Sequence, residues 1–214
     1  MIGNENEVTK YDFKSPKRLL DEEIPIIRKG LTHYIDLVEQ SISDYNHFRL
    51  NITKGDFEFT KFENIRSKLI DFSSGWTGRL ESNYAKYGCF WDQETFSSLL
   101  YIRLKGSLEG IENRILLRKN LITDFEISII EDIIIKDFHK TLFYSFAAYG
   151  NKKPRLQNIE TSLIEMEDNF ESKELVVSIP IQFHWKDLDS NELITKACMI
   201  FNQQFLREYN WRTI

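Results

Sequence analysis

The four histidines are the side chains of this chain best suited to bind a metal or transfer a proton. They are His33, His47, His139 and His184. None has a metal-binding side chain four residues further on, the spacing that sets two ligands on one helix face. The sequence therefore predicts no metal site and no cofactor, and it predicts His33 and His139 at the surface or at the edge of the core.

Carboxylates are the second group that could carry chemistry. Glu131 and Asp132 lie close to Asp137 in a predicted helix, and a second acidic cluster spans residues 165–168. Neither cluster comes with a glycine-rich phosphate loop or a nucleophile–base pair. We interpret the first as a solvated helix face and the second as a charged turn, so no catalytic residue is predicted.

Two cysteines, Cys89 and Cys198, lie far apart and form neither a CxxC pair nor a metal-binding spacing. Each lies in an apolar run, which predicts reduced, buried thiols. Thiols of this kind indicate a cytosolic chain.

Composition limits the remaining classes. The chain has 214 residues, 42% hydrophobic and 29% charged, with a net charge of −5. This length and balance predict one compact domain over residues 11–214 behind a flexible N-terminal tail, residues 1–10. The charge argues against nucleic-acid binding, and no apolar stretch is long enough to enter a membrane.

The elements that would position any site follow from apolar periodicity. Asp92 and Thr123 are predicted helix caps, and Thr123 forms a capping box with Glu126. Apolar residues around most of the helix that follows predict burial on two sides. Pro180 predicts an edge position or a bulge in its strand. The predicted helices are 21–45, 60–69, 92–104, 123–149 and 202–209, and the predicted strands are 76–82, 86–91, 115–117, 156–166, 175–185 and 193–201.

A short internal similarity adds to this pattern. Cys89–Phe96 resembles Cys198–Phe205: in both segments a strand ends, an Asp or Asn lies near the cap, and a helix follows. The similarity predicts two related halves that share one sheet.

The N-terminal region carries a more specific signal. Before the first long helix stands an opening motif made of Tyr11, Asp12, Phe13, Lys14 and Pro16, with Ser15 inside it. Further motifs follow in order at Thr60–Ile65, Leu100–Gly106, Thr123–Ile127, Leu175–Trp185 and Ala197–Phe205. Together they resemble, over residues 8–211, the middle domain of the flagellar motor switch protein FliM.

The resemblance implies a fold, a role and a site. The fold would be α/β (α+β), a three-layer α/β/α domain with pseudo-twofold halves shared with the CheC phosphatases. The role would be a non-enzymatic subunit of a motor switch ring or a related ring, cytoplasmic and peripheral at the inner-membrane face of the basal body. The partners would be a FliG-like protein, neighbouring copies of the chain and a FliN-like protein. The FliG-like partner would bind the loop Lys105, Gly106, Ser107, Leu108, Glu109 and Gly110.

Departures from the family leave alternatives open. The CheC phosphatases use a Glu-x-x-Asn pair on a helix, and no glutamate of this chain has an asparagine three residues on. Asp132 and Ile135 stand where that pair would be. Residues 1–10 do not match the family's CheY-binding peptide, and no C-terminal FliN-pairing domain follows. The alternatives are a regulatory module that binds a receiver domain, and a CheY-type phosphatase without the usual pair.

Overall fold

A computed structural model gives the structure of this protein. It describes residues 23–43, 48–80, 84–111, 123–142, 154–160 and 169–208. The predicted tail boundary, the opening motif Tyr11–Pro16 and the expected strand 115–117 lie outside these ranges. They remain predictions.

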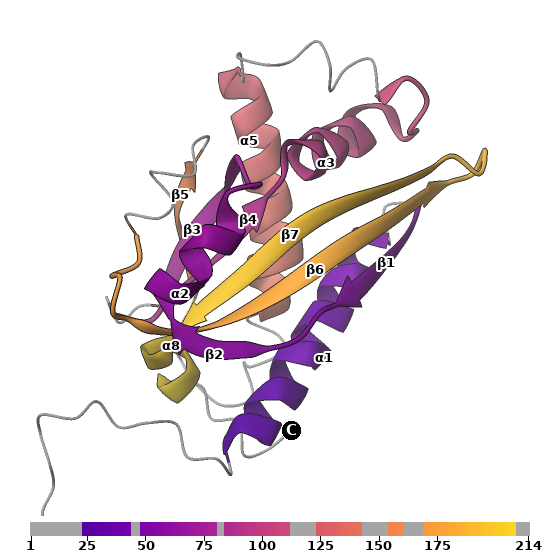
Figure 1. The fold of residues 1–214 in the computed structure, drawn as a ribbon. Coiled ribbons are helices and arrows are strands. Elements are labelled where there is room, and N and C mark those ends of the chain that lie inside the picture. The colour runs from indigo at the N-terminus through magenta and orange to yellow at the C-terminus, as the bar shows by residue number, and fades with distance from the viewer. Residues whose placement is uncertain are drawn as a thin grey trace, which may run out of the picture.

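The described strands form one seven-stranded antiparallel sheet (Figure 1). Its order is β1-β6-β7-β4-β3-β5, and β2 pairs with β6 beyond the end of β1. The strands are β1 Phe48–Lys54, β2 Glu58–Lys61, β3 Ser74–Leu80, β4 Lys86–Trp91, β5 Pro154–Glu160, β6 Leu175–Asp187 and β7 Glu192–Asn202.

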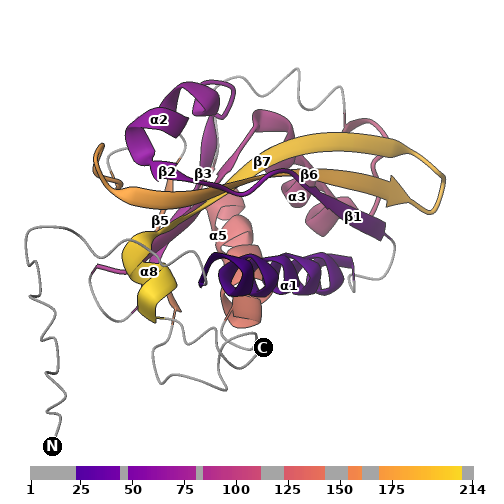
Figure 2. The ribbon, with the colours of Figure 1, turned by 60° about the horizontal axis from the view of Figure 1, so that its bottom comes forward.

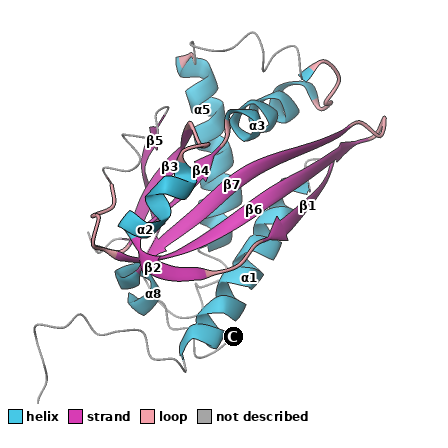
Figure 3. Cartoon of the chain, viewed as in Figure 1, coloured by secondary structure: helices cyan, strands magenta, loops and turns pink. Residues whose placement is uncertain are grey.

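Helices account for the remaining regular structure of the described residues (Figure 3). They are α1 Glu23–Ser43, α2 Phe62–Arg66, the 3₁₀ turn η1 Ser67–Leu69, α3 Gln93–Lys105, α5 Asp124–Ile133, its π-helical continuation η2 Ile134–His139 and α8 Gln203–Glu208. Thr123 and Glu126 form the predicted capping box with both hydrogen bonds present, which confirms that prediction. Among the described residues, no helix is both long and apolar enough to cross a membrane.

Three layers result, and they confirm the predicted fold class (Figure 2). Helices α1, α5 and α8 cover one face of the sheet, which we call the inner face, and α2 with η1 lies on the other, the outer face. The inner face holds the larger core, in which Trp76, Trp91 and Trp185 are almost completely buried. The smaller core under α2 includes Phe62 and Phe90.

The two halves of the sheet mirror each other. The strand order has the same pattern from both edges when β1 is matched with β5, β6 with β3 and β7 with β4. Asp92 and Asn202 cap α3 and α8 by accepting main-chain hydrogen bonds at 2.6 and 2.8 Å. Each also binds the opposite central strand, because Lys196 N donates to Asp92 and Lys86 N to Asn202. These matched contacts support the predicted pair of halves.

The repeat is shifted by one residue from the match made by sequence. Because the caps Asp92 and Asn202 are equivalent, Cys89, three residues before Asp92, corresponds to Met199 and not to Cys198. Cys89 and Met199 both face the inner core, whereas Cys198 faces the outer one. Both cysteines are buried and free, as predicted. Burial raises the pKa of both thiols.

Several boundaries differ from the predictions. Residues 48–61 contain β1 and β2, which were not predicted, and α2 therefore begins at Phe62 instead of residue 60. Strand β6 is interior, so the predicted edge position of Pro180 is wrong. Pro180 is tolerated because it lies opposite the interruption between β1 and β2, where its carbonyl accepts a hydrogen bond from Gly55 N at 2.8 Å.

Two side chains of η2 are more buried than predicted. Asp137 is 1% exposed and accepts a hydrogen bond from Ser41 of α1 at 2.8 Å. His139 is 6% exposed, with its ring centroid 5.1 Å from that of Trp76 on β3. This segment therefore contacts α1 on one side and the sheet on the other, as the two-sided apolar pattern predicted. The solvated interpretation holds for Glu131, which is exposed, but not for Asp137.

Candidate partner-binding loop

The loop 105–110 begins where α3 ends. Gly106 takes a left-handed conformation, φ 66°, and its N–H bonds to Ile102 O at 2.9 Å. A residue with a Cβ is strained in this conformation, so glycine terminates the helix here and turns the chain away from the helix axis. Gly110 has φ 77° at the other end of the loop. The two glycines thus define a short turn with fixed ends.

Asp187 at the end of β6 anchors the middle of this loop. Its carboxylate accepts hydrogen bonds from Leu108 N at 3.1 Å and from Asn191 N and Nδ2, both at 2.8 Å. Ser107 Oγ lies 3.5 Å from the same carboxylate. One buried carboxylate therefore ties the loop to the turn between β6 and β7.

The charge of Asp187 suits this role. Burial alone raises the pKa of a carboxyl group, but the hydrogen bonds from Asn191, Leu108 and Asp189 outweigh burial and bring the pKa below its usual value. The carboxylate form is therefore the one that holds the loop at neutral pH.

Tyr101 fixes the second half of the loop. Its hydroxyl donates to Glu109 O at 2.6 Å and lies 3.0 Å from Lys105 Nζ, which also lies over the Tyr101 ring at 4.9 Å. The loop backbone is thus held at both Leu108 and Glu109. A loop held in this way loses little conformational entropy when it binds a partner.

The predicted site residues divide into exposed and buried groups. Lys105, Glu109 and Gly110 are exposed, and Gly106 and Ser107 are half-buried. Leu108 is 3% exposed and belongs to the inner core. Leu108 therefore fixes the loop in place and does not offer its side chain to a partner. Leu104, just before the loop, is 43% exposed and adds an apolar contact that the sequence analysis did not include.

The anchor at Asp187 was also missed by the sequence analysis. The segment that follows Trp185 has the composition of a turn, but no local pattern connects it with a loop 79 positions earlier. Only the packing of the β6–β7 hairpin against the end of α3 brings the two together.

The position of the phosphatase pair is occupied by other interactions. Asp132 on α5 accepts hydrogen bonds from Lys136 Nζ at 2.8 Å and from Arg103 at 3.1 Å, which lower its pKa. Ile135 is 47% exposed and has no group that could orient a water molecule. Within the described ranges, no three His, Cys, Asp or Glu side chains gather as a metal site would require.

Comparison with known proteins relates this geometry to a fold. No protein-family model matches the sequence, and no curated protein matches it. Solved structures do match. A chain of the FliM–SpeE complex from H. pylori has a TM-score of 0.65 at 11% identity, over 89% of this chain and 96% of that one. FliY from Thermotoga maritima has a TM-score of 0.64 at 11% identity, over 89% and 94%.

A third structure, the FliG–FliM complex from H. pylori, gives a TM-score of 0.59 at 10% identity over 89% of this chain and 100% of that one. The chain has the fold of the FliM middle domain. The FliM-like fold spans nearly the whole length of these solved chains, so the resemblance drawn from the ordered motifs is confirmed at the level of the fold.

Proposed function

We propose that this chain is a non-enzymatic structural subunit of a flagellar motor switch or of a related ring. In this role it binds a FliG-like protein through the loop Lys105–Gly110. The observation that carries the proposal is the loop itself: a short turn on a FliM-like fold, exposed at Lys105 and Glu109 and held by Asp187 and Tyr101. That a FliM structure has been solved in complex with FliG supports this partner.

The wider assembly follows from the same proposal. Neighbouring copies of the chain would pack side by side in a ring at the cytoplasmic, inner-membrane face of a basal body, and a FliN-like protein would complete it. The proposed organisation of the chain is a tail over residues 1–10 and one domain over residues 11–214.

A co-purification experiment with the FliG-like protein of the same host tests the partner. The variant Lys105→Glu, Glu109→Lys reverses both exposed loop charges without changing the net charge. We expect it to weaken binding by about tenfold, because reversal replaces attraction with repulsion at each position. The matched control is Lys173→Glu, Glu131→Lys, which reverses two exposed charges elsewhere. Equal loss in the control, or no loss in the loop variant, would show that the loop is not the contact.

The non-enzymatic role has its own test. Asp132 is held in ion pairs with Lys136 and Arg103, and Ile135 cannot orient water, so we expect no acceleration of aspartyl-phosphate loss from a phosphorylated receiver domain. Phosphate release would be followed with and without the chain. Faster release that is abolished by Asp132→Asn would contradict this part of the proposal and favour the phosphatase alternative.

A further inference from the structure

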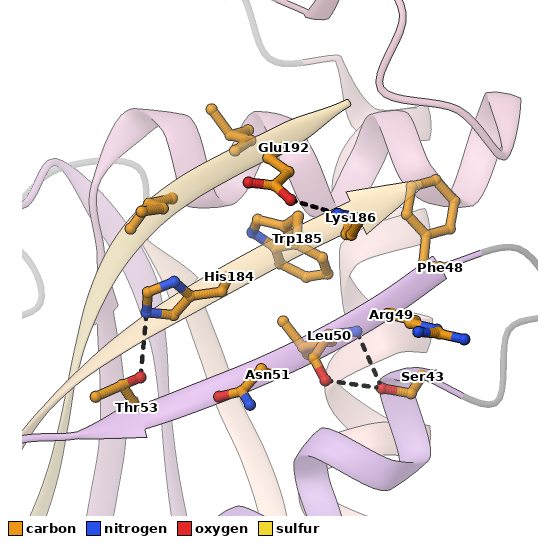
Figure 4. Close-up of a pocket in the computed structure, with 12 residues that line it drawn as sticks. Ser43, Phe48, Arg49, Leu50, Asn51, Thr53, His184, Trp185, Lys186 and Glu192 are labelled. Carbon is orange, nitrogen blue, oxygen red and sulfur yellow. Dashed lines mark hydrogen bonds and ion pairs between the residues drawn. The ribbon is translucent and has the colours of Figure 1, made fainter. Parts of the chain in front are cut away.

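No described helix lies on the outer face of the sheet at the end remote from α2 (Figure 2). An open groove of about 690 Å³ lies there on β1, β6 and β7, next to the last residue of α1, Ser43 (Figure 4). Arg49 and Asn51 on β1 and Lys186 on β6 are exposed at this groove. This face is separate from the loop Lys105–Gly110, whose Leu108 side chain packs into the inner core.

Three cross-strand rows of outward side chains make up this surface. They are Arg49–Lys186–Glu192, Asn51–His184–Ile194 and Thr53–Gln182–Lys196. We call these nine residues the outer-face patch. Because strands lie about 4.8 Å apart and rise about 3.3 Å per residue, the patch is about 10 Å wide and about 13 Å long.

Cations outnumber carboxylates in the outer-face patch. Glu192 bonds to Lys186 at 2.5 Å, so that pair is neutral (Figure 4). Arg49 lies directly opposite Lys186, and neither Arg49 nor Lys196 has an ion pair with a carboxylate among the described residues. Like charges on facing strand positions weaken a sheet. The positive excess therefore does not serve the fold, in a chain whose net charge is −5.

The edge of β1 beside the patch is closed to strand addition. Ser43 Oγ contacts both Leu50 N and Leu50 O at 3.3 Å, and Glu39 accepts a hydrogen bond from Ile52 N at 2.6 Å. Helix α1 thus occupies the main-chain groups that a partner strand would need. Recognition at this surface must use the outward side chains.

We infer that the outer-face patch binds an acidic segment of a partner protein. Arg49 and Lys196 supply two separate positive charges, and Ile194, 55% exposed, supplies an apolar contact in the middle row. The hydrogen-bonding side chains of Asn51 and His184 complete the middle row. A peptide with spaced carboxylates and apolar side chains between them matches this arrangement of charge, apolar contact and hydrogen bonding.

Other polyanions fit the patch less well. A site for single-stranded nucleic acid needs aromatic side chains on which bases stack, and none of the nine residues is phenylalanine, tyrosine or tryptophan. A duplex or an anionic membrane needs a larger basic surface, because its binding strength comes from many cation contacts. Two cations that have no ion pair with a described carboxylate, on an acidic chain, favour a short acidic peptide.

A labelled peptide of alternating glutamate and valine, with a matched peptide in which glutamine replaces glutamate, tests the inference by fluorescence anisotropy. We expect the acidic peptide to bind and the glutamine peptide to bind at least tenfold more weakly. Arg49→Glu and Lys196→Glu should each weaken the acidic peptide by about fivefold to tenfold. The control Lys173→Glu, which makes the same change in net charge, should leave its affinity within about twofold.

Several outcomes would overturn the inference. They are no binding of the acidic peptide, equal loss in the Lys173→Glu control, or tighter binding of a single-stranded oligonucleotide or of phosphatidylserine vesicles through Arg49 and Lys196. Lys105→Glu, Glu109→Lys should not change peptide affinity, so this test and the test of the FliG-like contact can fail independently. Circular dichroism of each variant would verify that it is folded.

Discussion

Trp76, Trp91 and Trp185 all lie on the inner face of the sheet, whereas the outward rows of β1, β6 and β7 carry Arg49, Lys196 and a half-exposed isoleucine. Strand β6 supplies both faces, with Trp185 buried and Lys186 exposed, because side chains alternate along a strand. Helices α1, α5 and α8 cover the inner face, and α2 with η1 is the only described helical segment on the outer face (Figure 2). The contrast teaches that residues on the inner face and under α2 are constrained by packing, while those at the end of the outer face remote from α2 are free to serve recognition.

The largest expected effect comes from the inner face. Trp76→Ala should lower the free energy of unfolding by about 3–5 kcal/mol, because it removes a side chain that is 1% exposed and packed against Tyr87 and Phe138. Urea denaturation monitored by circular dichroism measures it. The control Ile194→Ala, on the outer face, should cost less than about 1 kcal/mol. Similar losses in the two variants would break the comparison between the faces.

Low pH should also reduce the stability of the protein through a residue of the inner face. Burial lowers the pKa of His139 to about 4 from an ordinary 6.5, so the neutral ring is the one that fits beside Trp76. The unfolded chain binds the proton first, and stability should therefore fall as pH drops from about 6.5 to about 4, by up to about 3 kcal/mol.

The variant His139→Leu tests the source of this pH dependence. It removes the titrating group, so the slope of unfolding free energy against pH in this window should flatten even if the variant is less stable at neutral pH. An unchanged slope would assign the acid sensitivity to other groups.

The loop anchor should give a smaller effect. Asp187→Ala leaves Leu108 N and Asn191 N without their acceptor, at a cost of about 1–3 kcal/mol. Hydrogen exchange should show faster exchange at Leu108 and Glu109. Ser172→Ala, an exposed turn position, serves as the control. Binding of the FliG-like protein should weaken in the same variant in which the loop amides lose protection from hydrogen exchange. If exchange is unchanged, Asp187 is not the anchor.

The smallest stability effect should come from the outer-face patch. Arg49→Glu should change the unfolding free energy by no more than about 0.5 kcal/mol, and could raise it, because it replaces a repulsive contact with Lys186 by an attractive one. Thermal denaturation at low and high salt measures it. A loss above about 2 kcal/mol would mean that Arg49 is a structural residue, which would remove the reason to assign it to recognition.

Local chemistry predicted several elements correctly. The caps at Asp92, Thr123 and Asn202 are formed as predicted, because a cap joins groups only a few residues apart. The β6 strand was predicted because alternation of apolar and polar residues directly encodes its two faces. Strand β1 carries the same alternation, with Phe48, Leu50 and Ile52 buried, so its signal was present in the sequence and was overlooked. Strand β2 has only one apolar residue, Phe59, and its strand structure depends on pairing with β6.

Burial of polar groups was the less predictable part. Asp137 was expected to be solvated with its acidic neighbours, but the π-helical segment η2 places it against Ser41 of α1. A π turn contains an extra residue and moves the following side chains around the helix, so the helical period no longer assigns them correctly. The sequence carries no separate sign of this insertion.

For the candidate site, the sequence by itself determined the turn: Gly106 ends α3 and Gly110 closes the loop, because both need positive φ. It also determined which strand residues share a face, since alternation is a property of the extended chain. Only the tertiary structure decided that Leu108 is buried, that Asp187 holds the loop, and that one end of the outer face stays open. These features depend on contacts between residues far apart in the chain, and such contacts form only once the sheet and helices have packed together.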